Sequence, residues 1–394
     1  MNIAIINGKI ITPQKILEDK TLLIEGDSIK ALVDGDEYDK EIYQPIINAQ
    51  GGYITPGFID THSDKIEQII QPRPTSIMDF ELAMKEGEKE LVNQGITTMY
   101  HSLSLFQDNF FGSSSLRSQD NVLKLANLID SVHNRSHLIR HRLHLRIEID
   151  NLSAYEIVKN MIQQNKVHQI SFMDHTPGQG QYRNLEIYRE TISAYKSAQF
   201  VEVGFEGVLE YHQNKEMMSF EQIKTLANLA KEKNIPLASH DDDCCSKLTL
   251  NKELGVNISE FPITLEVARE AREMGFYTVA GAPNILLGGS HSGNMSVAEA
   301  ICNDFVDVLC SDYYPSALLH SIFIMYHKHG IPLADMVNRV TFNPAKAMMI
   351  DDEYGSIETG KKADILVIQI LNGYPVISHV LVDGKITSRL QYRL

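Results

Sequence analysis

The sequence predicts an α/β fold, a distorted (β/α)8 barrel of the TIM type with a small β-sandwich domain formed from both termini. Two observations lead to this prediction. Strand-like runs alternate with helical patterns across residues 53–348, and the eight strands that they supply are the number that closes a β/α barrel. The flanking residues 1–52 and 349–394 contain short strands and turns instead.

The two ends of the chain resemble each other in composition. Residues 1–52 hold runs of isoleucine, leucine and valine, separated by turn dipeptides such as Asn7-Gly8. Residues 349–394 repeat this texture in GSIETGKKADILVIQ (355–369) and VISHVLVDGKI (376–386). We therefore expect both ends to build one small sheet domain, the alternative being two unrelated surface hairpins.

The middle of the chain supplies the eight barrel strands and the helices between them. The strands are FIDTH (58–62), ITTMYH (96–101), LHLRIEI (143–149), QISFMDH (169–175), IPLASHD (235–241), VNISEFP (256–262), FYTVAGAP (276–283) and FVDVLCSD (305–312). Helices are expected at 78–95 and 219–234, where apolar residues recur at helical spacing. Gly95 and Asn234 are typical helix stops.

Composition and charge exclude several classes of function. The formal net charge of −15 argues against nonspecific nucleic-acid binding, which needs a basic surface. Four cysteines without a CxxC pair indicate reduced thiols rather than a disulfide scaffold or zinc knuckle. The sequence shows neither a signal peptide nor a long apolar run. We expect a soluble, cytoplasmic protein that contacts no membrane and pairs as a homodimer.

Polar residues gather at the ends of the predicted strands, where β/α barrels carry their catalytic groups. They are His62, Asp64, His101, Glu148, Asp174, His175, His240, Asp241, Glu260, Asn284 and Asp312. One such residue alone is more often a structural histidine or a helix cap. Their recurrence on most strands indicates a shared site.

These side chains suit a divalent metal. In His62-x-Asp64 both side chains point to the same face of a strand, so an imidazole and a carboxylate can grip one cation. Glu148 is a candidate bridge between two metals, and His175, His240 and Asp312 complete the predicted ligand set. Nitrogen and oxygen ligands suit one or two ions, zinc first, with manganese, iron or nickel as alternatives. Asp312 is also the expected general base, because it can take a proton from an attacking water.

The segment HNRSHLIRHRLHLR (133–146) is rich in histidine and arginine. His137 and His141 are four residues apart, but no acidic or cysteine residue accompanies them in the segment. We expect a solvated basic helix end that leads into the third strand rather than a metal or RNA site.

Several long motifs resemble the amidohydrolase superfamily. They include GGYITPGFIDTHSD (51–64), NPAKAM (343–348) and GSIETGKKADILVI (355–368). This resemblance implies a barrel with a sheet domain at both ends, divalent metal and hydrolysis. Most of the superfamily has His-x-His on the first strand where this chain has His-x-Asp, and many members carry a carboxylated lysine on the fourth strand, where QISFMDH has none.

These departures match a narrower branch, which cleaves the triphosphate of ribose 1-methylphosphonate 5-triphosphate in phosphonate catabolism. The motifs that resemble this branch are HSDKIE (62–67), PRP (72–74), HLRIEI (144–149), MDHTPGQGQY (173–182), SHDD (239–242), GAPNILLGGSHSGNMS (281–296) and SDYYPS (311–316). The resemblance implies a small phosphorylated substrate, cut between the α- and β-phosphorus atoms to leave the 5-phosphate and pyrophosphate.

The loop GGSHSGN (288–294) follows the seventh strand on the expected catalytic rim. Its backbone N–H groups can cradle phosphate oxygens before a helix that starts near Ser296. The predicted substrate-binding residues are Arg73, Gln179, Asn284, Gly288, Gly289, Ser290, His291 and Asn294. Arg73 offers a planar guanidinium for phosphate, and Gln179 belongs to a candidate lid. An exposed arginine and an ordinary glycine-serine loop are the plainer interpretations.

The preferred hypothesis is a triphosphate diphosphatase. One rival is an amidohydrolase that acts on a cyclic amide or an N-acyl substrate, in the manner of dihydroorotases or deacetylases. The other is a metal-poor scaffold or regulatory protein that has kept the barrel.

Overall fold

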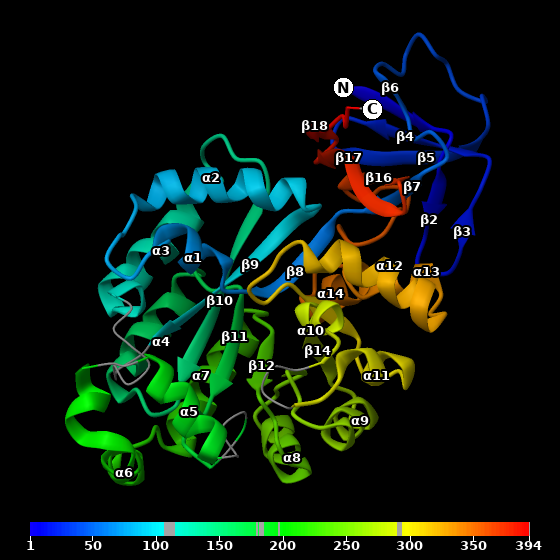
Figure 1. Cartoon of the computed structure of the whole chain (residues 1–394). Helices are drawn as coiled ribbons and strands as arrows, with labels where there is room; N and C mark the ends of the chain where they lie inside the picture. Colours follow the sequence, from blue (N-terminus) through cyan, green and yellow to red (C-terminus); the bar gives the residue numbers. More distant parts are fainter. Residues whose placement is uncertain (106–114, 179, 181–184, 196–197, 290–293, 394) are drawn as a thin grey trace.

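The structure is a computed structural model that describes all residues except 106–114, 179, 181–184, 196–197, 290–293 and 394. It confirms the predicted fold: an eight-stranded parallel sheet lies beside two smaller sheets (Figure 1). The barrel strands are β8 (Phe58–Ser63), β9 (Ile96–Leu105), β10 (Arg140–Glu148), β11 (Gln169–Met173), β12 (Leu237–His240), β13 (Ile258–Glu260), β14 (Tyr277–Gly281) and β15 (Val308–Cys310). Each coincides with a segment predicted from the sequence.

The barrel closes where its first and last strands meet. Neighbouring strands pair in parallel from β8 through to β15. A single bridge between Ser63 and Asp312 then joins the two edges. Backbone hydrogen bonds from Asp64 N to Asp312 O (2.8 Å) and from Asp312 N to His62 O (3.0 Å) support it. We call this junction, formed by residues 62–64 and Asp312, the seam.

Helices cover the outside of the barrel. They are α1 (Lys65–Ile70), α2 (Phe80–Asn93), α3 (Gln119–Val132), α4 (Tyr155–Gln163), α5 (Leu185–Tyr195), α6 (Ala198–Asn214), α7 (Phe220–Glu232), α8 (Cys245–Glu253), α9 (Leu265–Glu273), α10 (Pro283–Leu287), α11 (Val297–Cys302), α12 (Ala317–His329), α13 (Leu333–Asn338) and α14 (Phe342–Ala347). None of the described helices is long and apolar enough to cross a membrane.

The long helices show why the sequence pattern located them. In α7 the Ser219 side chain accepts the backbone N–H of Gln222, whose own side chain accepts that of Ser219, which is a capping box. The helix buries Leu226, Ala227 and Ala230 on one face. Asn234 follows in the left-handed region with a φ of 53°. Capping and an apolar stripe therefore fix its start, its face and its end.

Both termini contribute to the small β-sandwich. One sheet has the order β5 (Ser28–Asp34), β4 (Lys20–Glu25), β1 (Asn2–Ile6) and β6 (Ile46–Asn48). The other has the order β18 (Lys385–Arg389), β17 (Tyr374–Val382), β16 (Ile365–Leu371), β7 (Tyr53–Pro56), β2 (Lys9–Ile11) and β3 (Ile16–Leu17). Strand β7 therefore belongs to this domain, although it lies inside the predicted barrel range 53–348.

An apolar layer joins the two sheets of the sandwich. Residues from the start of the chain, such as Ile5 and Ile24, share a buried cluster with Ile365 and Val367 from its end. Burial of such side chains stabilises the domain by roughly 1.5–3 kcal/mol each relative to exposure. The ends of the chain lie close together for this reason (Figure 1).

Candidate metal centre

The alternation of strand β10 decides which of its side chains face the barrel interior. Leu143, Leu145 and Ile147 pack outward in the cluster beneath the helices. His144, Arg146 and Glu148 occupy the alternate positions and therefore point inward. Two residues of strand rise about 6.6 Å, so these three side chains lie at successive depths, with Glu148 nearest the rim.

Glu148 and His175 meet at the rim. Nδ1 of His175 lies 2.9 Å from one carboxylate oxygen of Glu148 and 3.0 Å from the other. Burial lowers the pKa of His175 and the Glu148 carboxylate raises it, and the net shift is upward. His175, which follows β11, therefore contacts Glu148, the last residue of β10.

His240 and Asp241 stand beside that pair. Nδ1 of His240 lies 3.0 Å from Oδ2 of Asp241. The ligand atoms of His175, His240 and Asp241 lie within 4.8 Å of one another. Asp241 has a φ of 54°, and this left-handed conformation turns the chain sharply at the end of β12.

The seam carries Asp64 and Asp312. Burial raises the pKa of Asp312 to about 7, and the nearby Asp64 carboxylate adds to the rise. Asp312 also has a positive φ, 58°, so the chain turns immediately after β15. A carboxyl group with a pKa near neutrality is suited to exchange a proton with water.

Arg146 is a site residue that sequence reasoning missed. Its guanidinium donates from Nη1 to Oδ1 of Asp64 at 3.2 Å, and its Nη2 lies 3.5 Å from Nε2 of His240. Its side chain is only 11% exposed, so the positive charge is held within the site. Burial raises the pKa of Asp64, but Arg146 opposes this and the net shift is downward.

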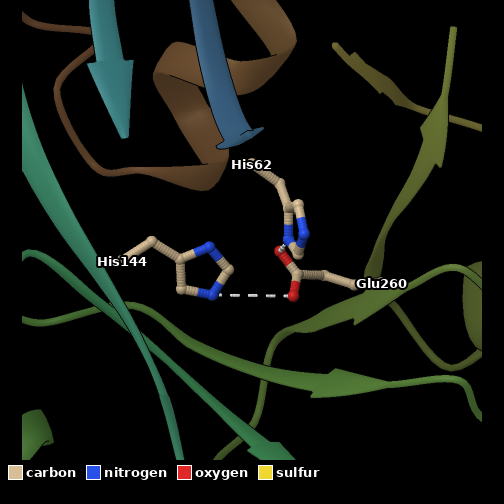
Figure 2. Close-up of side chains that lie close together, drawn as sticks. All are labelled: His62, His144 and Glu260. Atoms are coloured by element: carbon tan, nitrogen blue, oxygen red, sulfur yellow. Dashed lines mark ion pairs between the residues drawn. The ribbon is translucent and has the colours of Figure 1, made fainter. Parts of the chain in front are cut away.

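A second polar set lies deeper in the barrel, where His62, His144 and Glu260 converge from β8, β10 and β13 (Figure 2). One oxygen of Glu260 lies 3.4 Å from Nδ1 of His62, and the other lies 3.6 Å from Nε2 of His144. All three side chains are buried. Burial lowers the pKa of both imidazoles, to about 3 for His144, so they are neutral at pH 7.

The donor set fits a divalent cation. Nδ1 of His240 is buried and forms no hydrogen bond of good geometry with the described residues, although Oδ2 of Asp241 lies 3.0 Å away. Imidazole nitrogen and carboxylate oxygen without thiolate suit zinc, manganese, iron or nickel. Of the predicted ligands, Glu148, His175 and His240 gather at the rim. Asp64 and Asp312 face them from the seam, and His62 connects to the deeper set, its ring 5.6 Å from that of His240.

The structure describes only some of the predicted substrate residues. Arg73 is exposed in the loop after α1, where its backbone closes a turn with Ser76 (3.0 Å). Gly288, which ends α10 with a φ of 76°, and Gly289 border open space. Asn294 is half-buried after that loop. Gln179, Ser290 and His291 lie outside the described residues.

Asn284 is a predicted substrate residue whose side chain contacts the backbone. Its amide oxygen accepts the backbone N–H of Val297 at 3.0 Å, and its amide nitrogen donates to the backbone carbonyl of Met295 at 3.2 Å. Both ends of the amide therefore tie α10 to the start of α11, a short helix whose N-cap is Ser296, as expected. Its contact with a substrate stays a prediction.

The missed residues share one detectable signal. Glu148 is a predicted site residue. Because alternate residues of a strand point to the same face, Arg146 and His144 share the face of Glu148. Glu260 was noted at its strand end, but its partners come from β8 and β10. Contacts between distant strands of a barrel interior cannot be read from spacing along the chain.

Known proteins show clear similarity to this chain. The sequence pattern of the amidohydrolase family matches residues 53–387. The α-D-ribose 1-methylphosphonate 5-triphosphate diphosphatase of Escherichia coli is 33% identical over 349 residues, which cover 86% of this chain and 89% of that protein. The N-acetylglucosamine-6-phosphate deacetylase of Haemophilus influenzae is 24% identical over 98% of this chain and 99% of its own length.

Solved structures confirm the architecture. The N-acetylglucosamine-6-phosphate deacetylase of Pasteurella multocida superposes with a TM-score of 0.63 at 15% identity. The match covers 98% of this chain and 99% of that one. At this identity the similarity supports the fold alone.

Proposed function

This chain belongs to the amidohydrolase family, and on that premise we propose that it is a metal-dependent hydrolase that cleaves a ribose 5-triphosphate between its α- and β-phosphorus atoms. The products are the 5-phosphate and pyrophosphate. The Escherichia coli diphosphatase, 33% identical over most of both chains, supports this substrate class. The predicted ligands Glu148, His175, His240, His62, Asp64 and Asp312 are the residues that would hold the metal.

Arg146 is the observation that carries the proposal. A guanidinium cannot be deprotonated in a protein, so it keeps a positive charge beside the metal ligands. An amide develops negative charge on one oxygen only as its tetrahedral intermediate forms, whereas a triphosphate is anionic throughout binding and reaction. A phosphoanhydride gains much, because negative charge spreads over the phosphoryl oxygens as the bond breaks. The position of Arg146 against Asp64 and His240 therefore favours an anionic reacting centre.

The reaction divides among the residues of the site. A bound divalent metal would lower the pKa of a water molecule and neutralise phosphate charge. The water oxygen forms a bond to the α-phosphorus, and the bond from that phosphorus to the bridging oxygen breaks, so that pyrophosphate leaves. Asp312 accepts the proton, for which a pKa of about 7 suits it. The glycine backbone at 288–289 would contact the outer phosphates.

Hydrolysis of an N-acyl substrate is the second candidate. The N-acetylglucosamine-6-phosphate deacetylase of Haemophilus influenzae favours it, because that protein is similar to this chain over nearly its whole length. In that case the phosphate group would serve as a handle for binding, and the reacting centre would be an amide.

A single assay separates the two candidates. Metal-loaded protein is incubated with a ribosyl or nucleoside 5′-triphosphate and, separately, with an N-acetyl sugar phosphate, while pyrophosphate, orthophosphate and acetate are quantified. We expect pyrophosphate as the product. Release of orthophosphate alone, or acetate release without triphosphate turnover, would exclude the diphosphatase function.

A further inference from the structure

Of the deep set formed by His62, His144 and Glu260, only His62 is among the proposed metal ligands, and the buried carboxylate of Glu260 beside it has no part in the reaction described above. We propose that Glu260 is a positioning residue: it holds His62 through Nδ1 and leaves Nε2 as the nitrogen that binds the metal. This inference rests on the metal dependence in the proposed function. Glu260 is then the partner that fixes the orientation of the metal ligand His62.

The depth of Glu260 argues against direct contact with the substrate. Its side chain is fully buried, and one oxygen accepts the Gln169 side-chain N–H at 2.9 Å. Gln169 pairs with His144 in the sheet register. His144 precedes Glu148 by four residues, which is about 13 Å of strand. Glu260 itself pairs with His240 in the register of β12 and β13, but its carboxylate contacts side chains at the level of His144, below the position of Glu148.

Two consecutive residues contact His62 from two sides: Glu260, the last residue of β13, and Phe261, which follows it. Oε1 of Glu260 lies 3.4 Å from its Nδ1 (Figure 2). The ring of Phe261 meets the imidazole edge-on at 4.9 Å between centroids. Phe261 has a φ of 55°, an unfavourable conformation for a bulky residue. In this conformation its ring lies between the imidazoles of His62 and His240, with 5.1 Å between its centroid and that of His240.

A carboxylate that faces Nδ1 fixes the tautomer of the ring. The proton resides on Nδ1, where it points to the negative oxygen, and the lone pair resides on Nε2. Metal-binding histidines commonly donate their second ring nitrogen in this way, and loss of the acceptor weakens metal binding about 10- to 100-fold. His144 completes the arrangement, because its Nε2 lies 2.8 Å from the Ser171 hydroxyl and 3.6 Å from Glu260.

Charge also links Glu260 to the metal. The groups that contact its oxygens among the described residues are the Gln169 amide and the imidazoles of His62 and His144, with no lysine or arginine among them. A carboxylate buried without a cationic partner is costly. A cation bound at Nε2 of His62 would reduce that cost, because only the imidazole ring would separate it from Glu260. Metal and carboxylate should therefore stabilise each other, and this coupling must be reciprocal.

The test compares Glu260→Gln with Glu88→Gln. Glu88 is the matched control, because it is also buried and its Oε2 also lies 3.4 Å from a histidine nitrogen, Nε2 of His141, but outside the barrel. Zinc affinity is measured by competition with a chelator, together with metal stoichiometry and the metal-induced rise in Tm. Glu260→Asp, which keeps the charge, tests for partial rescue.

We expect Glu260→Gln to weaken zinc binding about 10- to 100-fold with unchanged stoichiometry and a smaller metal-induced rise in Tm. Glu260→Asp should fall between this variant and the parent, and Glu88→Gln should bind zinc normally. Unchanged affinity in folded Glu260→Gln, or a parent protein that takes up no metal, would overturn the proposal. So would the loss of a whole metal equivalent, because the spacing of 3.4 and 3.6 Å also suits direct ligands of one ion.

These measurements need no substrate. A parent protein that fails to release pyrophosphate but shows the expected affinity changes would refute the diphosphatase function and leave the role of Glu260 standing.

Discussion

Histidines gather on both faces of strand β10, and the two faces use them differently. On the inner face, His144 shares its surroundings with Arg146, Glu148 and the metal ligands. On the outer face, His141 stacks on His101, with 2.9 Å between Nδ1 and Nε2, and lies 3.4 Å from Glu88 of α2. His133 accepts the backbone N–H of His141 at 3.1 Å. The outer histidines thus pair with one another, with one carboxylate and with the backbone.

The difference shows what separates a structural cluster from a chemical one. The outer cluster, defined as His101, His133, His141 and Glu88, contains one carboxylate and no arginine. The inner site concentrates several carboxylates around a fixed cation. Burial there raises the pKa of Asp312 to about 7, the Asp64 carboxylate adds to the rise, and Arg146 opposes it. Opposing charges in a confined volume create groups that can exchange protons and bind metal. Histidine content alone does not separate the two faces.

The sharpest test of this contrast is Asp312→Asn. Loss of the proton acceptor and of a metal ligand should lower kcat for pyrophosphate release at least about 10²–10⁴-fold. The metal-free variant should melt no lower than the parent, because a carboxyl group repelled by Asp64 has been removed. Kinetics and thermal denaturation measure the two effects. A kcat within tenfold of the parent would contradict the role of Asp312.

Arg146→Met should have the next largest effect. Removal of one preorganised charge at the reacting centre should reduce triphosphate hydrolysis about 10²–10³-fold, and Arg146→Lys should recover part of the loss. Arg140→Met is the matched control. It removes an inward arginine from the other end of β10, where Asp364 and Asp383 are its partners, and should lower Tm without a change in kcat. Equal kinetic losses in both variants would show that Arg146 acts through stability alone.

The sequence predicted the elements more completely than the contacts between them. Every barrel strand was recognised, because the turn residues and polar ends that bound a strand are local signals. The segment 133–146 was expected to be a solvated basic helix end that leads into the third strand, and this holds for residues 133–136 after α3 but not for His141. His141 is buried on a strand, and its acidic partner Glu88 lies 53 residues earlier in the chain. Only the packing of α2 against β9, which pairs with β10, brings the two together.

The site was predictable to a similar degree. Residues at strand ends follow from topology, because parallel strands present their carboxyl ends on one rim. The partner of each predicted ligand does not follow from topology. The contacts of Arg146 with Asp64 and of Glu260 with His62 join distant strands and are known only from the structure. A polar residue on the rim can also make structural contacts, as Asn284 does when it ties α10 to the start of α11.

Glu88→Gln tests the outer face with a smaller expected effect. Glu88 accepts the backbone N–H of Leu138 at 2.7 Å and contacts His141. Weakening these contacts should cost about 1–3 kcal/mol in the free energy of unfolding, while kcat and metal content stay at parent values. Urea denaturation and metal analysis provide the readouts. A loss of activity per bound metal would show that the outer cluster communicates with the site.

The smallest effect concerns acid stability. His133 and His168 accept backbone N–H groups at the start of β10, and burial lowers their pKa values to about 4 and about 3. The unfolded chain binds protons at its ordinary histidine pKa near 6.5, whereas the folded chain does not. Stability should therefore fall as pH drops from about 6.5 towards 4.

His168→Asn isolates this contribution, because an amide oxygen accepts the Leu143 N–H at any pH. Urea midpoints measured at pH 7 and pH 5 should differ less for this variant than for the parent. An identical difference would mean that His168 titrates normally in the folded protein.

The seam has a consequence for how the protein is made. Ser63 and Asp312 are 249 residues apart, yet their strands must meet before Asp64 and Asp312 face each other. At about 5–20 residues per second, a ribosome needs about 12 to 50 s to cover that interval. During this time the first ligands leave the exit tunnel without the last one. If the proposed centre holds metal, its full loading must accordingly follow synthesis of the final barrel strand, and a chain stalled before residue 312 would lack one of the proposed ligands.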